Sequence, residues 1–239
     1  MLVLYFLIFK RETVISLLEG DINLQVNKIL LYHGNKPLRA FREYKESGFQ
    51  TTVEMLLSTN LYISEMRLIV DYTKKSTPKY GFVDLMLLEE SSFLYSAIIE
   101  LKLFNLVGLY CGKKGEWIKN PEFKDLYKLN EELKTEAEDE LINRNYMHWS
   151  KDDNCYKIIT AKKYIDEGVK QLKKYIFVIS KGNAQIKEKS VGILDSRISI
   201  ESGLSYTRGI LIASFGSQRV LTREINLKKI YRKFVINDK

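Results

Sequence analysis

Three charged side chains interrupt two apolar, β-favouring segments of the chain. Asp84 lies within the run 82–88, and Glu100 and Lys102 lie within the run 97–104. A carboxylate or an ammonium group in a dry core is costly unless it is paired or bound to a metal. Two carboxylates and one lysine that meet at the end of a sheet would form a site for a hard divalent cation.

The strands that carry these residues decide whether they meet. Residues two apart in an extended strand point the same way, so Glu100 and Lys102 share a face and Leu101 points into the opposite core. If the two runs pair as a hairpin around residues 89–92, Asp84 can lie near Glu100. A structural alternative remains open, in which Glu100 and Lys102 form an ion pair on a half-exposed edge strand and Asp84 pairs with another lysine.

Composition limits the class of protein. The chain has 239 residues, 45% of them hydrophobic, which is ample for a sizeable core. Its net charge of +8 suits a polyanionic partner such as nucleic acid. Two cysteines without metal-ligand spacing and two histidines leave little room for a zinc site, and predict reduced thiols in an intracellular protein. The apolar start, residues 1–9, is too short to span a bilayer and lacks signal-peptide features, so we expect no membrane partner.

Hydrophobic periodicity predicts the order of elements. The chain up to residue 104 reads as helices followed by three strands, and the charged segment 105–160 reads as a helical insertion. After it we expect an amphipathic helix and a final strand pair. The predicted ranges are helices over 11–32, a helix from Thr51, a strand over 61–72, the two charged strands, surface helices within 122–145, a helix over 161–176, and strands over 208–215 and 219–225.

Trp117 and Trp149 lie in the predicted insertion among several lysines. Interleaved aromatic and basic residues can stack on nucleic-acid bases. Packing of the two tryptophans between the insertion and the core is the more common arrangement, and both interpretations stay open.

The pattern Asp84, then Glu100-Leu101-Lys102, resembles the D-Xn-E-x-K signature of the PD-(D/E)xK nuclease superfamily, although Val83 stands where the family name has proline. Gln171 on the later helix, in a Gln-Leu-Lys-Lys-Tyr setting, is similar to a branch found C-terminal to AAA-ATPase-like regions in bacterial and fungal proteins. The resemblance implies an α/β fold of the restriction-endonuclease-like type. This is a central mixed sheet flanked by helices, with residues 1–239 as one domain and 105–160 as a helical insertion.

The resemblance also implies roles for individual residues. Asp84 and Glu100 would bind Mg²⁺ or Mn²⁺ with the carbonyl of Leu101, and Lys102 would orient or activate the attacking water. Glu54 would face the metal from the preceding helix, although Thr51 and Glu54 equally fit a capping box at its start. Gln171 would hold the phosphate backbone, or is an ordinary polar helix residue. The lysines around it, which would bind nucleic acid, are Lys170, Lys173 and Lys174.

The resemblance therefore predicts an intracellular, metal-dependent nuclease that hydrolyses phosphodiester bonds in nucleic acid, with DNA favoured over RNA. The alternative is a catalytically inactive member that keeps the fold to bind nucleic acid or a protein partner.

Overall fold

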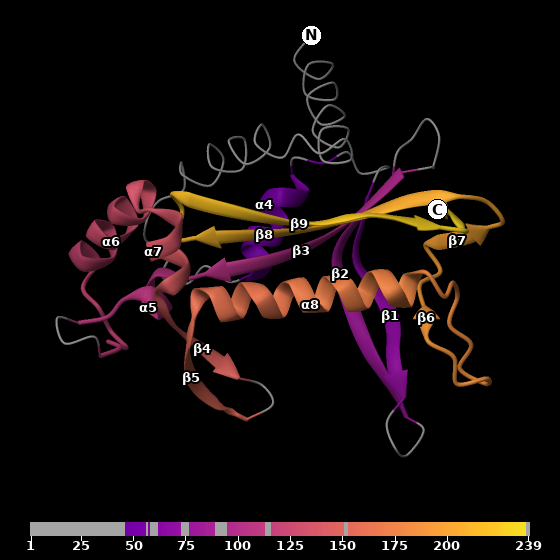
Figure 1. Ribbon diagram of the computed structural model, residues 1–239. Helices are drawn as coiled ribbons and strands as arrows, with labels where there is room; N and C mark the ends of the chain where they lie inside the picture. Colours follow the sequence, from indigo (N-terminus) through magenta and orange to yellow (C-terminus); the bar gives the residue numbers. More distant parts are fainter. Residues whose placement is uncertain are drawn as a thin grey trace, which may run out of the picture.

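The computed structural model describes residues 46–55, 57, 62–72, 77–88, 95–112, 116–150 and 153–237. The expectations for residues 1–9 and 11–32 lie outside these ranges. The described residues form a mixed α/β structure, in which helices flank a mostly antiparallel central sheet (Figure 1). None of the helices in the described ranges is both long and apolar enough to cross a membrane.

The helices and strands occur in a regular order along the chain. They are α4 (Glu46–Glu54), β1 (Tyr62–Tyr72), β2 (Pro78–Leu88), β3 (Tyr95–Phe104), α5 (Leu106–Leu109), α6 (Phe123–Thr135), α7 (Glu138–Asn143), β4 (Asn145–Ser150), β5 (Cys155–Thr160), α8 (Ala161–Ile179), β6 (Gly192–Ile193), β7 (Ile198–Glu201), β8 (Ser205–Phe215), β9 (Arg219–Ile230) and β10 (Lys233–Ile236).

The central sheet has the strand order β6-β1-β2-β3-β8-β9. The strand predicted over 61–72, the two charged strands and the final strand pair are confirmed as β1, β2, β3, β8 and β9. β2 and β3 pair antiparallel as the hairpin hypothesis requires, and β8 and β9 also pair antiparallel. The pairing of β3 with β8 is parallel, so the sheet is mixed.

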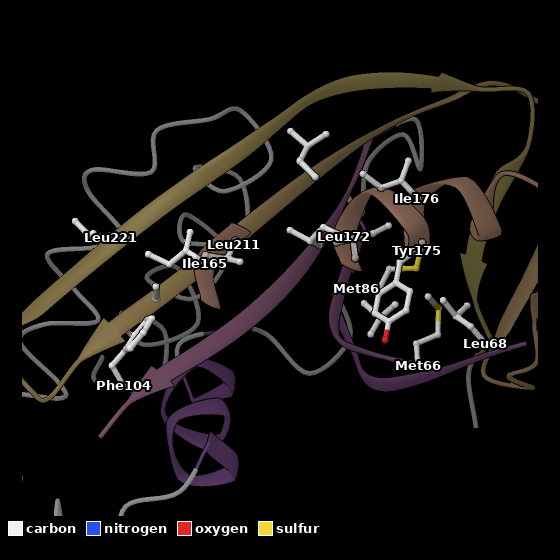
Figure 2. Packing of buried hydrophobic residues seen from close by; sticks show 14 of the residues in the cluster. Met66, Leu68, Met86, Phe104, Ile165, Leu172, Tyr175, Ile176, Leu211 and Leu221 are labelled. Atoms are coloured by element: carbon white, nitrogen blue, oxygen red, sulfur yellow. The ribbon is translucent and has the colours of Figure 1, made fainter. Parts of the chain in front are cut away.

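Each face of the sheet is covered by a helix. In β3, Ile98 and Phe104 belong to the apolar cluster that includes α8, whereas Ile99 and Leu101 belong to the cluster that includes α4. α8 begins at the cap residue Thr160, whose side chain accepts a hydrogen bond from Lys163 N. Figure 2 shows the α8 layer with labelled residues from the helix and the sheet: Ile165, Leu172, Tyr175, Ile176, Met66, Leu68, Met86, Phe104, Leu211 and Leu221.

The sheet divides between β2 and β3. The two strands pair only over residues 85–88 and 96–99, although both continue beyond the last pair, Leu85 with Ile99. Past that point the rest of β2 pairs with β1, and the rest of β3 pairs with β8. Figure 1 shows β1 and β2 (purple) bending away from β3, β8 and β9, with α8 (orange) running across both parts. We call the place where β2 and β3 separate the fork.

β2 changes the face that it turns toward α8 at the fork. Val83 and Met86 belong to the same cluster around α8, although residues three apart in a regular strand point to opposite faces. Gly81 also lies against α8, since a Cβ there would be 2.9 Å from Cε1 of Tyr175. Asp84 therefore lies at a local twist of the strand, which a strict alternation of faces does not predict.

Two local expectations are wrong. The helix that carries Glu54 begins at Glu46, so Thr51 is an interior residue and no capping box forms. Its hydroxyl instead donates to the carbonyl of Ser47, four residues earlier, which is a hydrogen bond open to threonine inside a helix. The segment 105–160 is also not purely helical, because after α5, α6 and α7 it ends in the β4–β5 hairpin.

Candidate functional site

Glu100 and Lys102 form a buried ion pair on the α8 side of the sheet. Nζ of Lys102 lies 2.7 Å from Oε1 of Glu100, and the two side chains are 12% and 2% exposed. The stem of Lys102 passes α8 at Gly168, where a Cβ would lie 3.2 Å from Cε of the lysine. The alternation in β3 thus places both charged groups on one face, as the sequence predicts, but under a helix rather than on an exposed edge.

Asp84 lies across the fork from this pair. Asp84 is the first residue of β2 beyond the last pair with β3. Its Oδ2 accepts a hydrogen bond of 2.6 Å from the backbone N–H of Leu101. The carboxylate therefore takes the place of a backbone acceptor. In an antiparallel ladder the N–H and C=O of one residue point to the same neighbour, so the carbonyl of Leu101 also opens toward the fork.

Asp84, Glu100 and Lys102, which we call the charged cluster, bring two carboxylates together with one ammonium group at the fork. Burial raises the pKa of Asp84 to about 6, while the hydrogen bond from Leu101 and the charge of Lys102 partly offset it. Burial likewise raises the pKa of Glu100, and the nearby charge of Asp84 adds to the shift. Burial alone would lower the pKa of Lys102, but the carboxylates of Glu100 and Glu46 outweigh it and hold that pKa above its ordinary range.

Glu46, and not Glu54, is the α4 residue beside this cluster. Oε1 of Glu46 lies 4.0 Å from Nζ of Lys102, and its charge raises the pKa values of Asp84 and Glu100. Glu54 lies eight residues further along α4, about 12 Å along the helix axis. Its carboxylate accepts a hydrogen bond from Gln50. Burial raises the pKa of Tyr62, and the negative charge of Glu54 raises it further. The sequence offered no signal for Glu46, because the start of this helix was expected at Thr51.

Gln171 approaches the cluster through Tyr175. Its amide nitrogen donates to the Tyr175 hydroxyl at 2.9 Å, and that hydroxyl would lie 3.2 Å from a Cβ at Gly81. Burial raises the pKa of Tyr175, and the negative charge of Glu100 raises it further. Gln171 therefore positions a tyrosine hydroxyl near the carboxylates. The helical spacing of the two residues was visible in the sequence, but the role of Tyr175 was missed.

The three lysines predicted to bind nucleic acid lie on the outer side of α8. Lys170, Lys173 and Lys174 are exposed, while Leu172 on the same turns is buried against the sheet. The helix therefore separates these ammonium groups from the cluster at the fork. Their exposure fits any solvated helix face, so their contact with phosphates stays a prediction.

A pocket of about 560 Å³ lies beside the cluster, next to the insertion. Both tryptophans line it, together with Glu46 and Tyr164, and the ring centre of Tyr164 is 5.6 Å from Nζ of Lys102. Trp117 is anchored, since its Nε1 donates to the carbonyl of Val107, whereas Trp149 is about half exposed. Structural packing therefore accounts for Trp117 better than for Trp149.

Asp84, Glu100 and the carbonyl of Leu101 are the groups at the fork that could hold a cation. Within the described ranges, no group of three or more histidine, cysteine, aspartate or glutamate side chains is arranged to bind a metal. Magnesium, however, is commonly held by one or two carboxylates and keeps several waters. Oε2 of Glu100 is buried without a hydrogen-bond partner, which is the kind of oxygen that a cation would satisfy.

No known protein family, curated protein or solved structure matches the chain. The assignment of a function therefore depends on the geometry at the fork and on the sequence pattern.

Proposed function

We propose that the protein is a metal-dependent nuclease of the PD-(D/E)xK, restriction-endonuclease-like superfamily. The observation that carries this proposal is the buried, unpartnered Oε2 of Glu100, next to Asp84 and the carbonyl of Leu101. A dry oxygen of this kind is costly unless something binds it. Mg²⁺ or Mn²⁺ at these oxygens would polarise a phosphate and lower the pKa of a bound water.

The residues of the chain have separate tasks in this proposal. Asp84 and Glu100 hold the cation with the carbonyl of Leu101. Lys102, paired with Glu100 at 2.7 Å, places a positive charge where negative charge develops on the scissile phosphate. Tyr175, oriented by Gln171, fixes the β2 side of the fork around Gly81. DNA is the favoured substrate over RNA, and an intracellular location remains part of the proposal.

The decisive experiment is a cleavage panel with double-stranded, single-stranded, circular and linear DNA and with RNA, each in Mg²⁺, Mn²⁺ or EDTA. We expect cleavage that needs the metal and falls at least about a hundredfold in Glu100→Gln. Asp166→Asn is the matched control, because Asp166 is an exposed carboxylate on α8 paired with Lys162. Cleavage that survives in EDTA, or that Glu100→Gln leaves intact, would overturn the proposal.

A second candidate is a binding module that uses the same fold without catalysis. The 2.7 Å ion pair between Lys102 and Glu100 favours it, because this pair already neutralises one charge of the cluster. This candidate predicts nucleic-acid binding without cleavage in any metal. It also predicts that Mn²⁺ leaves the melting temperature unchanged, whereas a metal-binding cluster predicts a rise in the wild type that Asp84→Ala abolishes.

A further inference from the structure

The aromatic pocket opens directly beside the charged cluster. Six of its lining residues have aromatic rings: Trp117, Tyr146, His148, Trp149, Tyr156 and Tyr164. One of these rings, that of Tyr164, has its centre 5.6 Å from Nζ of Lys102, and Glu46, which also lines the pocket, lies 4.0 Å from the same atom. A strand whose phosphate lies at Lys102 would therefore have a neighbouring nucleotide at the mouth of this pocket.

Two of the six aromatic residues that line the pocket have a structural role. Tyr146 is buried, its ring packs on Phe104 at 4.8 Å between centres, and its hydroxyl donates to the carbonyl of Leu103. Trp117 is tied to Val107 through its ring nitrogen. The contacts of Tyr146 hold the insertion against β3, and the hydrogen bond of Trp117 joins two parts of the insertion to each other, so both residues are explained without any ligand.

Trp149 and Tyr156 have no such anchoring role. They are 48% and 54% exposed and face each other across the β4–β5 hairpin, with ring centres 5.0 Å apart. The ring centre of Tyr156 also lies 5.6 Å from that of Trp117, so the two exposed rings are next to an anchored one. Tyr156 therefore lies between the rings of Trp117 and Trp149, and a flat apolar ligand that covered the exposed faces of Trp149 and Tyr156 would bury apolar surface that water contacts in the free protein.

The chemistry of the lining indicates the ligand. Stacking on tryptophan and tyrosine is how proteins hold unpaired bases, since every base has a flat π face. Lys119 and Asn120 at the pocket supply a positive charge and a hydrogen-bonding amide near those rings. The volume of about 560 Å³ lies within the range of small-ligand sites. The net charge of +8 favours a polyanion.

We propose that the pocket between the β4–β5 hairpin and the start of α8 binds one unstacked nucleobase. This base belongs to the strand whose neighbouring phosphate lies at Lys102, close to Glu46 and Tyr164 of the pocket. The protein thereby prefers single-stranded or locally opened nucleic acid over an intact duplex. The inference rests on the proposed function only for the identity of the polymer; the pocket requires no metal.

The test measures binding in EDTA, so that neither metal nor cleavage enters the result. Fluorescence anisotropy follows labelled single-stranded DNA and RNA, a duplex of equal length, and a single strand with abasic sites. The test variant is the double substitution Trp149→Ala with Tyr156→Ala. Phe177→Ala is the control, because Phe177 is a 58% exposed ring on α8 that does not line the pocket. Both altered side chains are exposed, so the variants should fold, and circular dichroism verifies this.

We expect the double variant to bind single strands at least about tenfold more weakly, while duplex binding changes less than twofold. The abasic strand should already bind the wild type weakly, and the double substitution should weaken it little further. Equal losses for single strand and duplex, unchanged single-strand binding, or no binding by the wild type would each overturn the inference. If the base preference holds but no metal supports cleavage, the inference stands and the nuclease proposal fails.

Discussion

Gly168 of α8 lies directly against the side chain of Lys102. A Cβ at this glycine would be 3.2 Å from Cε of Lys102 and closer still to Cδ1 of Leu211. The absence of a side chain lets the helix pass close over the charged strand. This close approach buries the ion pair of Glu100 and Lys102 between α8 and β3, which is a central strand of the sheet.

Gly168→Ala should therefore reduce stability despite the better helix propensity of alanine. Propensity adds up to about 1 kcal/mol, but overpacking costs typically about 1–3 kcal/mol, so we expect a net loss of about 1 kcal/mol in the free energy of unfolding. Urea denaturation measures it. Glu167→Ala, at the exposed neighbouring position, serves as control and should lose nothing. A Gly168→Ala protein as stable as the wild type would contradict the close packing.

Lys102→Ala separates a catalytic role from a binding role. In the proposed nuclease it should lower the cleavage rate about a hundredfold or more and change nucleic-acid affinity far less. If the protein is a binding module, neither the wild type nor the variant should cleave nucleic acid. Rate and affinity should be measured on the same variant at one salt concentration, since phosphate contacts weaken with salt. Cleavage unaffected by Lys102→Ala would exclude the proposed mechanism.

The same substitution should destabilise the protein, because it leaves the Glu100 carboxylate buried without its partner. Loss of one member of a buried pair costs about 3–5 kcal/mol in general. The double substitution Lys102→Ala with Glu100→Gln should recover part of this loss, since a neutral amide is less costly to bury. Thermal unfolding of the single and double variants tests this, and a double variant less stable than Lys102→Ala would refute it.

Glu46 and Glu54 provide a matched pair on one helix. Glu46 lies 4.0 Å from Lys102, whereas Glu54 interacts with Gln50. Glu46→Gln should therefore weaken Mn²⁺ binding about threefold to tenfold, because it removes a negative charge near the carboxylates. Glu54→Gln should leave the affinity unchanged. Calorimetric titration with Mn²⁺ decides between them, and the reverse order would restore the sequence-based assignment of Glu54.

Asp195 predicts a pH dependence of stability away from the candidate site. Its carboxylate accepts hydrogen bonds of 2.7 and 2.9 Å from the guanidinium of Arg197, which in turn donates to the carbonyl of Ser64 in β1. These hydrogen bonds from Arg197 lower the pKa of Asp195, even though partial burial opposes them. The carboxylate therefore stabilises the fold above its unfolded pKa of about 4, and the contribution disappears as the pH falls through the lower folded pKa.

Asp195→Asn should accordingly lower the free energy of unfolding at pH 7 by about 1–3 kcal/mol and flatten its fall below pH 4. Denaturation at pH 7 and at acidic pH provides the measurement. Asp153→Asn is the control, because the pKa of Asp153 is also lowered, by hydrogen bonds from Lys157 and Ser150, but Asp153 is exposed. Exposed pairs contribute little, so the control should show neither effect. Equal behaviour of the two variants would contradict the prediction.

The sequence by itself determined the features that depend on local periodicity. Alternation of apolar residues identified β1, β2 and β3, and a spacing of two placed Glu100 and Lys102 on one face. The apolar stripe of α8 and the β8–β9 pair were likewise visible. These features could be predicted because neighbouring residues in a helix or strand point in directions set by backbone geometry alone.

Only the tertiary structure decided which distant groups meet. β2 twists at Asp84 and separates from β3 there, while it stays paired with β1 and β3 stays paired with β8. The approach of Glu46 to Lys102 depends on where α4 begins and how it packs, which the Thr51–Glu54 pattern misrepresented. The pocket of Trp149 and Tyr156 depends on a hairpin in which β5 is largely exposed and β4 is partly buried, without a clear alternation in either strand. Such contacts follow from the packing of separate elements, and no spacing along the chain encodes them.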